Sequence, residues 1–243
     1  MDIRVMESYD EMSDLAATLV VDQVKNKPDS VLGLACGASP IGLYKRLVEA
    51  GKRGEVDFSK VKTVNVDEYI GVPAESPDSY HGFMRKHLFD ELGIKPENTL
   101  IPDGMAVDIL SECARYSHTI KEWGGIDLMV LGIGANAHIG FNEPGDAFVP
   151  ETHVVELSEA TRNANCHFFA NPKDMPHWAI SMGIQEIMFA RGLILLASGT
   201  AKTVALGKMA GDITPQAPAS ILQLHRHVII IADKAAAARL EQE

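Results

Sequence analysis

The stretch of residues 132–144 combines two side chains that could move protons. His138 lies five residues before Glu143, and two glycines near the start of the stretch let the chain turn sharply. A loop histidine polarised by a carboxylate can act as an acid or a base near neutral pH. A loop histidine beside a solvated glutamate would show the same residues. The glycines are a weak dinucleotide-binding signal, because Ala137 occupies the third glycine position of GxGxxG.

Two adjacent carboxylates, Asp67 and Glu68, follow an apolar run at residues 61–66. Either could serve as a general base at the end of a strand. Neighbouring side chains of an extended chain point to opposite faces, so we expect one carboxylate to be functional and the other structural. An aspartate that caps a polar loop is the alternative interpretation.

Two short segments are typical of anion sites at the start of a helix. In residues 36–40, Ser39 suits the N-cap and Pro40 suits the first helical position. Such a loop presents free backbone N–H groups to an anion. In residues 198–202, Lys202 would add a full positive charge to a second site of this kind. The alternatives are an ordinary capped turn for the first segment and a solvated surface lysine for the second.

Alternating strands and helices must position these side chains. Five apolar runs have strand length, at residues 30–35, 61–66, 126–132, 192–197 and 227–232. Helical patterns occur at residues 9–26, 40–51, 79–92, 108–123 and 201–210. Nearly continuous apolar runs are typical of parallel strands buried on both faces. The sequence therefore predicts a single domain over residues 1–243, with a doubly wound, Rossmann-like α/β fold and helices on both faces of a mostly parallel sheet.

The place of the motifs in this pattern indicates one shared site. Ligands of doubly wound folds bind beyond the carboxyl ends of the strands. The four candidate segments each follow directly on an apolar run. We therefore expect them to meet at one edge of the sheet.

The composition narrows the possible partners and compartment. The chain has 243 residues, 46% of them hydrophobic, and a net charge of −11, which argues against a nucleic-acid partner. No apolar run approaches the ~20 residues that span a bilayer, and the N-terminus lacks a signal-peptide pattern. Three widely spaced cysteines predict free thiols in a reducing compartment, and no residue set shows metal-ligand spacing. We expect a soluble cytoplasmic protein with no membrane partner and no metal.

Four motifs, taken in order, carry a resemblance to a known family. They are Asn65-x-Asp67-Glu68-Tyr69, the run that ends Phe141-Asn142-Glu143-Pro144, then Ser198-Gly199-x-x-Lys202, and Pro218-Ala219-Ser220-x-Leu222-Gln223-x-His225. The set closely resembles the glucosamine-6-phosphate deaminases. The likeness runs over nearly the whole chain, from about residue 5 to residue 235.

The resemblance implies an enzyme that converts glucosamine 6-phosphate and water to fructose 6-phosphate and ammonia without a cofactor. In that reaction His138 would assist opening of the sugar ring, with Glu143 behind it and Asn136 orienting it. Asp67 would take the proton from C2 and deliver it to C1. The residues that would hold the substrate phosphate are Cys36, Gly37, Ala38, Ser39, Lys202 and His167.

Several positions depart from the usual pattern of the family. His167 stands where the family has an arginine that contacts the phosphate, and a histidine lacks the guanidinium fork. Either phosphate affinity falls, or another cation such as Arg162 compensates, or the substrate differs. Asn136 replaces an aspartate of many members and adds no negative charge. Ala137 replaces a common glycine, which raises the question whether that turn needs a positive φ.

The resemblance also bears on regulation and assembly. Residues 145–175 resemble the family's mobile lid over the active site. Residues 145–155 hold no lysine or arginine, whereas larger allosteric members carry basic residues there for an effector's phosphate. The chain also stops soon after Asp233. We therefore expect a monomer that amino-sugar phosphates do not activate.

Three other functions stay open at this point. Galactosamine 6-phosphate is an alternative substrate, because Cys36, Ala38, Ala137 and His167 are unusual. A 6-phosphogluconolactonase would have a related fold, but its usual loop reads Asp-Gly-His-Thr and lacks the Phe-Asn-Glu-Pro run. A non-catalytic sugar-phosphate sensor would carry a DNA-binding helix-turn-helix, for which this chain has no room before its first apolar run.

Overall fold

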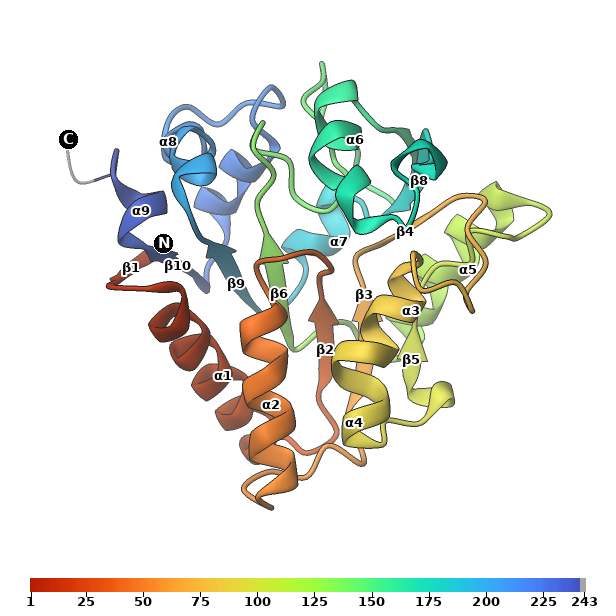
Figure 1. Ribbon diagram of the computed structural model, residues 1–243, viewed down its shortest axis with the longest axis vertical. Coiled ribbons are helices and arrows are strands. Elements are labelled where there is room, and N and C mark those ends of the chain that lie inside the picture. The colour runs from red at the N-terminus through yellow and green to blue at the C-terminus, as the bar shows by residue number, and fades with distance from the viewer. Residues whose placement is uncertain (241–243) are drawn as a thin grey trace.

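A seven-stranded sheet forms the centre of the computed structural model, which describes residues 1–240 (Figure 1). The strands lie in the order β1-β10-β9-β6-β2-β3-β5, and every neighbouring pair is parallel. Their bounds are β1 (Asp2–Met6), β2 (Val31–Leu34), β3 (Lys62–Asn65), β5 (Thr99–Leu100), β6 (Leu128–Gly132), β9 (Gly192–Ala197) and β10 (Val228–Asp233). The five apolar runs form β2, β3, β6, β9 and β10, which confirms those predictions.

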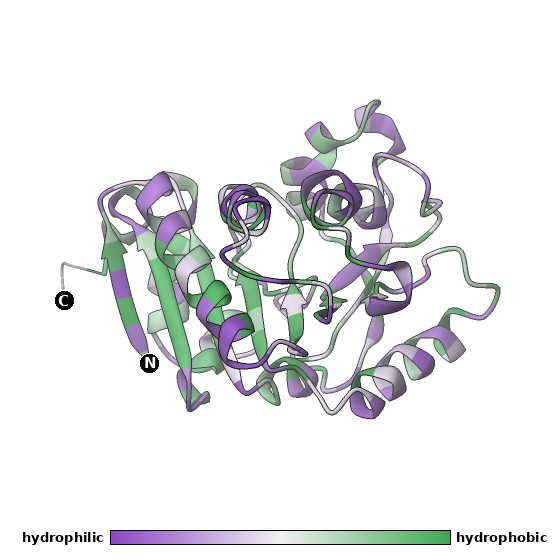
Figure 2. Cartoon of the chain, turned by 90° about the horizontal axis from the view of Figure 1, so that it is seen from below, coloured by the Kyte–Doolittle hydropathy of each residue, from purple (hydrophilic) through white to green (hydrophobic). Residues whose placement is uncertain are grey.

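Alternate side chains of the sheet face two separate hydrophobic cores. In β9, Leu193 and Leu195 lie in one core, whereas Ile194 and Leu196 lie in the other. Each such buried side chain stabilises the fold by about 1.5–3 kcal/mol. Figure 2 shows hydrophobic residues concentrated along the central strands, with helices on both sides of them.

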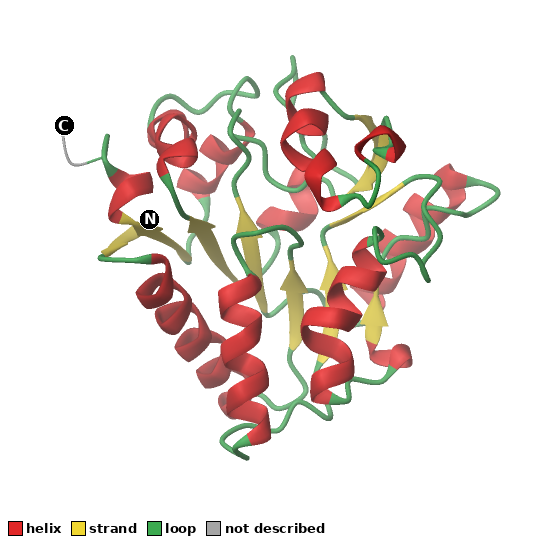
Figure 3. Cartoon of the chain, in the orientation of Figure 1, coloured by secondary structure: helices red, strands yellow, loops and turns green. Residues whose placement is uncertain are grey.

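The helices divide between these two cores. One core receives side chains from α1 (Tyr9–Asn26), α2 (Ile41–Lys52) and α3 (Tyr80–Met84). The other receives them from α5 (Ile109–Glu122), α7 (Ile184–Met188), α8 (Thr203–Ala210) and α9 (Lys234–Ala237). Figure 3 shows the helices surrounding the strands in this way. The predicted doubly wound α/β fold is therefore confirmed.

The start of α2 differs from the prediction. Pro40 occupies the N-cap rather than the first helical position, and no side chain caps the helix from the preceding loop. The backbone N–H of Gly42 instead donates to the Tyr9 hydroxyl at 2.7 Å, which fills the role of an N-cap side chain. The prediction that Ser39 caps this helix is therefore wrong. Across residues 1–240 the Ser39 hydroxyl has no hydrogen-bond partner, so it is available to a ligand.

Two other predicted helices are broken by tighter or wider turns. The pattern at residues 79–92 forms α3, a π-helical turn (Arg85–Phe89) and then α4 (Asp90–Leu92). Ser79 caps α3 by accepting from the N–H of Gly82 at 2.9 Å. The pattern at residues 201–210 begins with a 3₁₀ turn (Thr200–Lys202) before α8.

A second, three-stranded sheet has no counterpart in the sequence patterns. Its antiparallel strands lie in the order β4 (Asp67–Tyr69), β8 (Trp178–Ser181) and β7 (His153–Glu156). The chain leaves β3 at Asn65 and joins this sheet at Asp67, which pairs with Ser181. Asp67 is thus fixed at the junction of the two sheets.

Three general properties bear on the class of protein. No helix in the described part of the chain is long and apolar enough to cross a membrane. The cysteines Cys36, Cys113 and Cys166 are free. Among residues 1–240, no group of three or more histidine, cysteine, aspartate or glutamate side chains is placed to hold a metal ion.

Candidate active site

A cavity of about 610 Å³ opens at the carboxyl edge of the main sheet. Its walls come from the loops that follow β2, β3, β6 and β9 and from α6 (Glu159–Asn165). Figure 1 shows the strands β2, β6 and β9 pointing toward this edge, with α6 above it. The predicted site residues that line the cavity are Cys36, Gly37, Ala38, Ser39, Asp67, Asn136, His138, His167 and Lys202. Glu143 is the exception, because it lies behind His138.

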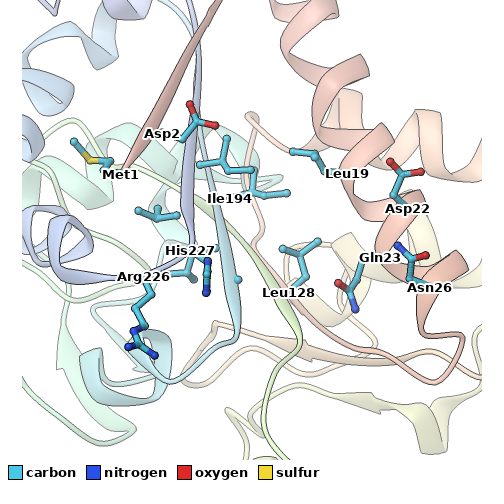
Figure 4. A pocket seen from close by; sticks show the side chains of 14 residues that line it. Met1, Asp2, Leu19, Asp22, Gln23, Asn26, Leu128, Ile194, Arg226 and His227 are labelled. Carbon is cyan, nitrogen blue, oxygen red and sulfur yellow. The ribbon is translucent and has the colours of Figure 1, made fainter.

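A second hollow, of about 540 Å³, lies at the opposite edge of the sheet (Figure 4). It is bordered by the first residues of β1, β6, β9 and β10 and by α1. Its charged groups are Asp2, Asp22 and Arg226, and none of the residues singled out by the sequence lines it. Because none of the candidate site residues lines this hollow, whereas nearly all of them line the carboxyl-edge cavity, the latter is the candidate active site.

One end of the cavity is built from turns that can bind an anion. Gly37 adopts a φ of +108°, and a Cβ added there would meet no other atom within 4 Å. The Gly37 backbone can therefore approach a ligand closely. Gly199 adopts a φ of +84°, and its N–H donates to both carboxylate oxygens of Asp233 at 3.1 and 3.0 Å. Asp233 thereby fixes the loop that presents Lys202.

Lys202 supplies the positive charge of this end. Burial lowers the pKa of its ammonium group, because removal from water disfavours the charged form. Within residues 1–240, no carboxylate forms an ion pair with it. A bound phosphate would replace the lost hydration, so Lys202 is suited to hold a dianion.

Cys36 lines this end, but its thiol is not suited to be a reactive group. Burial, together with the nearby charges of Asp67 and Glu68, raises the thiol pKa well above its usual value. The amide of Asn65 contacts Sγ at 3.4 Å. A protonated thiol is a poor nucleophile.

His138 and Glu143 form the predicted pair, and two residues of the α6 segment join it. His138 Nδ1 lies 3.7 Å from Glu143 Oε2 and 3.4 Å from Thr161 Oγ1. Asn136 donates to Glu143 Oε2 at 2.6 Å and accepts from the His138 backbone N–H at 3.1 Å. Ser158 donates to Glu143 Oε1 through its hydroxyl at 3.1 Å and through its N–H at 3.3 Å. Asn136 therefore orients the carboxylate and the loop rather than the imidazole ring.

The carboxyl group of Glu143 is ionised throughout the neutral range. Burial by itself would raise its pKa, but interactions with His138, Thr161 and Asn136 lower the pKa to about 2. Only 11% of its side chain is exposed. A fixed negative charge behind His138 can stabilise the imidazolium form when that ring takes up a proton.

The turn before His138 depends on two small residues. The carbonyl of Gly134 accepts from the Ala137 N–H at 2.9 Å, and the Gly134 N–H donates to the His138 carbonyl at 2.9 Å. Ala137 adopts a φ of +74°, which answers the question raised by the sequence: this turn does require the left-handed region. For alanine that conformation costs about 1–2 kcal/mol. The turn places the His138 ring close to the Cα of Gly134, in the space that a Cβ there would occupy.

Gly134→Ala should reduce turnover more than stability. The new Cβ would clash with three ring atoms of His138, Cε1, Nε2 and Cδ2, so the imidazole must move. A displacement of about 1 Å in a catalytic group can cost about 100-fold in rate, and we expect a loss of that order in kcat/KM. Steady-state kinetics would measure it.

Gly207→Ala is the matched control, because a Cβ at that helical glycine meets nothing within 4 Å. It should keep the original kcat/KM. Full activity of Gly134→Ala would show that the position of the His138 ring is not critical.

The two adjacent carboxylates lie in different surroundings. Glu68 is buried and accepts from the N–H groups of Tyr69, Tyr80 and His81 at 2.8, 3.0 and 3.0 Å. It thereby anchors the start of α3, so its role is structural. Asp67 faces the cavity, and no hydrogen bond holds its side chain within the described part of the chain.

The protonation of Asp67 is set by its surroundings. Burial is the main reason that the pKa of Asp67 is raised to about 8, and the neighbouring charge of Glu68 is a smaller one. A carboxyl group with a pKa near the working pH is suited to proton transfer in both directions. Asp67 is therefore a candidate general acid–base group.

Three residues that the sequence analysis did not assign also belong to this site. Tyr80 lines the cavity, with its hydroxyl 3.1 Å from that of Tyr69, and burial raises its pKa. Ser158 and Thr161 contact the histidine–glutamate pair. Local sequence gives no signal for these roles, because each residue also fits the start of a helix.

The proposed substitute for the missing arginine fails. Arg162 does not line the cavity, and its Nε is buried without a partner among residues 1–240. It therefore cannot compensate for His167 at the phosphate end. His167 does line the cavity and packs against Phe168, with ring centroids 4.1 Å apart.

Anion-binding turns, a desolvated lysine and two acid–base groups in one cavity define an α/β enzyme for a small anionic substrate. The chain belongs to the glucosamine-6-phosphate isomerase and 6-phosphogluconolactonase family, whose sequence model matches residues 6–231. This finding confirms the resemblance drawn from the four motifs.

Individual relatives narrow the match within the family. The chain is 50% identical over 242 residues to a glucosamine-6-phosphate deaminase of Clostridium botulinum (strain Langeland / NCTC 10281 / Type F), which covers 99% of each chain. It is 48% identical over 244 residues to a glucosamine-6-phosphate deaminase of Thermoanaerobacter sp. (strain X514), covering 100% of this chain and 96% of the relative. These full-length matches favour the deaminase branch.

Solved structures agree with the sequence relatives. The structure of a monomeric glucosamine-6-phosphate deaminase superimposes with a TM-score of 0.95 at 41% identity, covering 98% of this chain and 99% of that one. The 6-phosphogluconolactonase of Trypanosoma cruzi gives a TM-score of 0.77 at 22% identity, over 98% of this chain and 96% of that one. The second match shows the shared fold alone.

Proposed function

We propose that this chain is a glucosamine-6-phosphate deaminase, which converts glucosamine 6-phosphate and water to fructose 6-phosphate and ammonia. The observation that carries the proposal is the meeting of Asp67, His138 and Lys202 in one cavity. The reaction needs separate groups to open the sugar ring, to move a carbon-bound proton and to hold the phosphate. The full-length deaminase relatives support the same assignment.

The phosphate is held at the end of the cavity formed by residues 36–39 and Lys202. The Lys202 ammonium group and the loop N–H groups neutralise the dianion. The Ser39 hydroxyl, which does not cap α2, donates a further hydrogen bond. His167 lines the cavity from the α6 side.

Ring opening falls to His138. The ring takes the proton of the C1 hydroxyl and returns a proton to the ring oxygen, which breaks the C1–O5 bond. Glu143, ionised behind the imidazole, stabilises the positive charge that the ring carries between these transfers. The product is the open-chain aldehyde, in which the C2 proton is acidic.

Asp67 then moves the proton from C2 to C1. The carboxylate removes the C2 proton, the electrons form a C1=C2 double bond, and the C1 oxygen takes up a proton from solvent to give the enolamine. Asp67 then returns its proton to C1 while the nitrogen lone pair forms the C=N bond at C2. The resulting C2 imine adds water, and collapse of the carbinolamine releases ammonia and leaves the ketone of fructose 6-phosphate. The reaction requires neither a metal ion nor a redox cofactor, because every step is a proton transfer, an addition or an elimination without a net change of oxidation state.

A parallel assay tests the proposal directly. Ammonia and ketose phosphate should form from glucosamine 6-phosphate faster than from galactosamine 6-phosphate, with 6-phosphogluconolactone hydrolysis measured beside them. Faster turnover of galactosamine 6-phosphate would change the assigned substrate. Absence of ammonia from both amino sugars would refute a deaminase.

The pH profile should report the titration of Asp67. Only the ionised carboxylate can accept the C2 proton, and its pKa is about 8 in the free protein. We therefore expect kcat/KM to rise with pH and to level off above about pH 8, because this ratio reports the free enzyme. The substrate amine also ionises. Its titration should be measured separately by NMR, and its contribution should be removed from the pH profile of kcat/KM. A profile that stays flat from acidic to alkaline pH would contradict the role of Asp67.

His167→Arg should tighten binding of the substrate phosphate. Arginine brings a permanent charge and a bidentate fork to the rim of the cavity. We expect KM to fall by about 3- to 10-fold with kcat little changed, since the new contact binds the phosphate equally in the ground state and the transition state. His118→Arg, on the exposed side of α5 and outside the cavity, is the charge-matched control. An unchanged KM would mean that the phosphate does not reach position 167.

The segment of residues 145–175 acts as the lid in this proposal, because α6 within it covers the cavity and supplies part of its wall. The chain works as a cytoplasmic monomer that amino-sugar phosphates do not activate. The monomeric structural relative and the absence of lysine and arginine at positions 145–155 support the lack of assembly and of activation. Sigmoidal kinetics that become hyperbolic with N-acetylglucosamine 6-phosphate would contradict it.

A further inference from the structure

Ser158 stands at the point where the lid helix meets the ring-opening pair. It is the N-cap of α6, and its hydroxyl oxygen accepts from the N–H of Thr161 at 3.2 Å. The same hydroxyl donates to Glu143 Oε1 at 3.1 Å, and the Ser158 N–H approaches the same oxygen at 3.3 Å. Ser158 thus both caps the start of α6 and donates hydrogen bonds to the buried carboxylate of Glu143.

The carboxylate of Glu143 draws its donors from two different segments. Oε2 accepts a hydrogen bond from the side-chain amide of Asn136, which belongs to the same loop as His138. Oε1 accepts hydrogen bonds from the hydroxyl and the backbone N–H of Ser158. If α6 moved away, Oε1 would lose both of these hydrogen bonds, although the Glu143 side chain is largely buried in the present arrangement.

The α6 segment also contacts the space where the substrate lies. Ala160, Thr161, Ala164 and Asn165 line the cavity from this helix. Thr161 Oγ1 lies 3.0 Å from Ser158 Oγ and 3.4 Å from His138 Nδ1. Contacts between a ligand and α6 therefore reach Glu143 and His138 through two hydroxyl groups.

We propose that Ser158 is a positioning residue that couples the placement of α6 to ring opening. The proposal rests on the deaminase function. With α6 seated on the substrate, Ser158 holds Glu143 in the orientation that supports His138. With α6 displaced, the pair loses that support, so the ring is opened only when the cavity is covered.

Three substitutions at this position separate capping from support of Glu143. Ser158→Thr keeps the hydroxyl and should stay within about threefold of the original kcat. Ser158→Ala removes the donor to a charged group and should lower kcat by about 10- to 100-fold. Ser158→Asp keeps a good N-cap but sets a second carboxylate against Glu143, so it should lower kcat further than alanine does.

Two further measurements exclude a purely structural effect. Asp108→Ala removes the N-cap of α5, where the aspartate accepts from the Ser111 N–H at 3.1 Å, and no residue of α5 lines the cavity. It should leave kcat unchanged. The acyclic alditol, 2-amino-2-deoxyglucitol 6-phosphate, needs no ring opening, so its Ki for Ser158→Ala should stay within about threefold of the original value.

The outcomes are distinguishable. Full activity of Ser158→Asp would show that Ser158 only caps the helix and would overturn the inference. A rise in the alditol Ki that matches the loss in kcat/KM for Ser158→Ala would also overturn it, because lid stability alone would then explain the effect. An inactive original protein would refute the deaminase function itself, whatever the variants do.

Discussion

Asp67→Asn is expected to abolish exchange of the substrate C2 proton with solvent and to lower kcat on the order of 10³-fold. Asparagine has nearly the same shape as aspartate but cannot accept the proton, and a positioned general base contributes about 10²- to 10⁴-fold. The measurement is incorporation of deuterium at C2 and C1 in heavy water, followed by NMR. Because β4 fixes the backbone of residue 67 by pairing with Ser181, the substitution should leave the cavity in place.

The fold of Asp67→Asn can be checked through its stability. The folded state raises the pKa of Asp67 to about 8, so its buried charge destabilises the protein progressively as the pH rises from the usual aspartate range to that value. A neutral asparagine should therefore raise Tm at pH 9 and change it little at pH 4. Substantial exchange by a folded Asp67→Asn protein would remove Asp67 from the role of base.

Glu68→Gln is the control for position 67. Glu68 carries the same charge one residue away but anchors the N–H groups of Tyr80 and His81. Its substitution should lower Tm while each folded molecule still exchanges the C2 proton. Equal losses of exchange in both variants would point to a general disturbance of the strand.

Glu143→Gln is the second substitution with a large expected effect, a loss in kcat of about 10²- to 10³-fold. The variant removes the negative charge that supports a protonated His138, and its amide would oppose the donors from Asn136 and Ser158. Ring opening should then limit the rate. A primary isotope effect measured with substrate deuterated at C2 should fall toward one, whereas Asp67→Asn should retain it in any residual turnover.

Glu186→Gln is the matched control for Glu143→Gln. Glu186 is also a partly buried carboxylate that accepts two hydrogen bonds, from Thr152 at 2.6 Å and from Gly183 at 3.0 Å, but it lies outside the cavity. This variant should lose stability and keep the isotope effect. An undiminished isotope effect in Glu143→Gln would show that Glu143 does not act in ring opening.

The sequence predicts the central strands because burial on both faces leaves a visible pattern. The runs that form β9 and β10 are apolar at successive positions, since each face packs against helices. The edge strand β1 exposes Ile3 and Val5, and β4 consists of Asp67, Glu68 and Tyr69, so neither shows that pattern. Such strands are fixed by distant partners rather than by their own composition.

Some residues of the candidate site could likewise be predicted from the sequence, and others could not. The residues that follow strands were predictable, because parallel strands bring their carboxyl ends to one edge. The cap of α2 was not, because the Tyr9 hydroxyl, from a distant part of the sequence, takes the N–H of Gly42. Ser158 and Tyr80 were missed for the same reason, since only tertiary structure brings them to Glu143 and the cavity.

The pairing of β1 with β10 has a consequence for synthesis on the ribosome. Residues 2–6 leave the ribosome long before their partners, residues 229–233. The strand β1 must therefore wait until β10 has been translated, and closing so long a loop carries an entropic cost. The sheet is completed last at β1, so a nascent chain interrupted before β10 would leave that strand unpaired and exposed to aggregation.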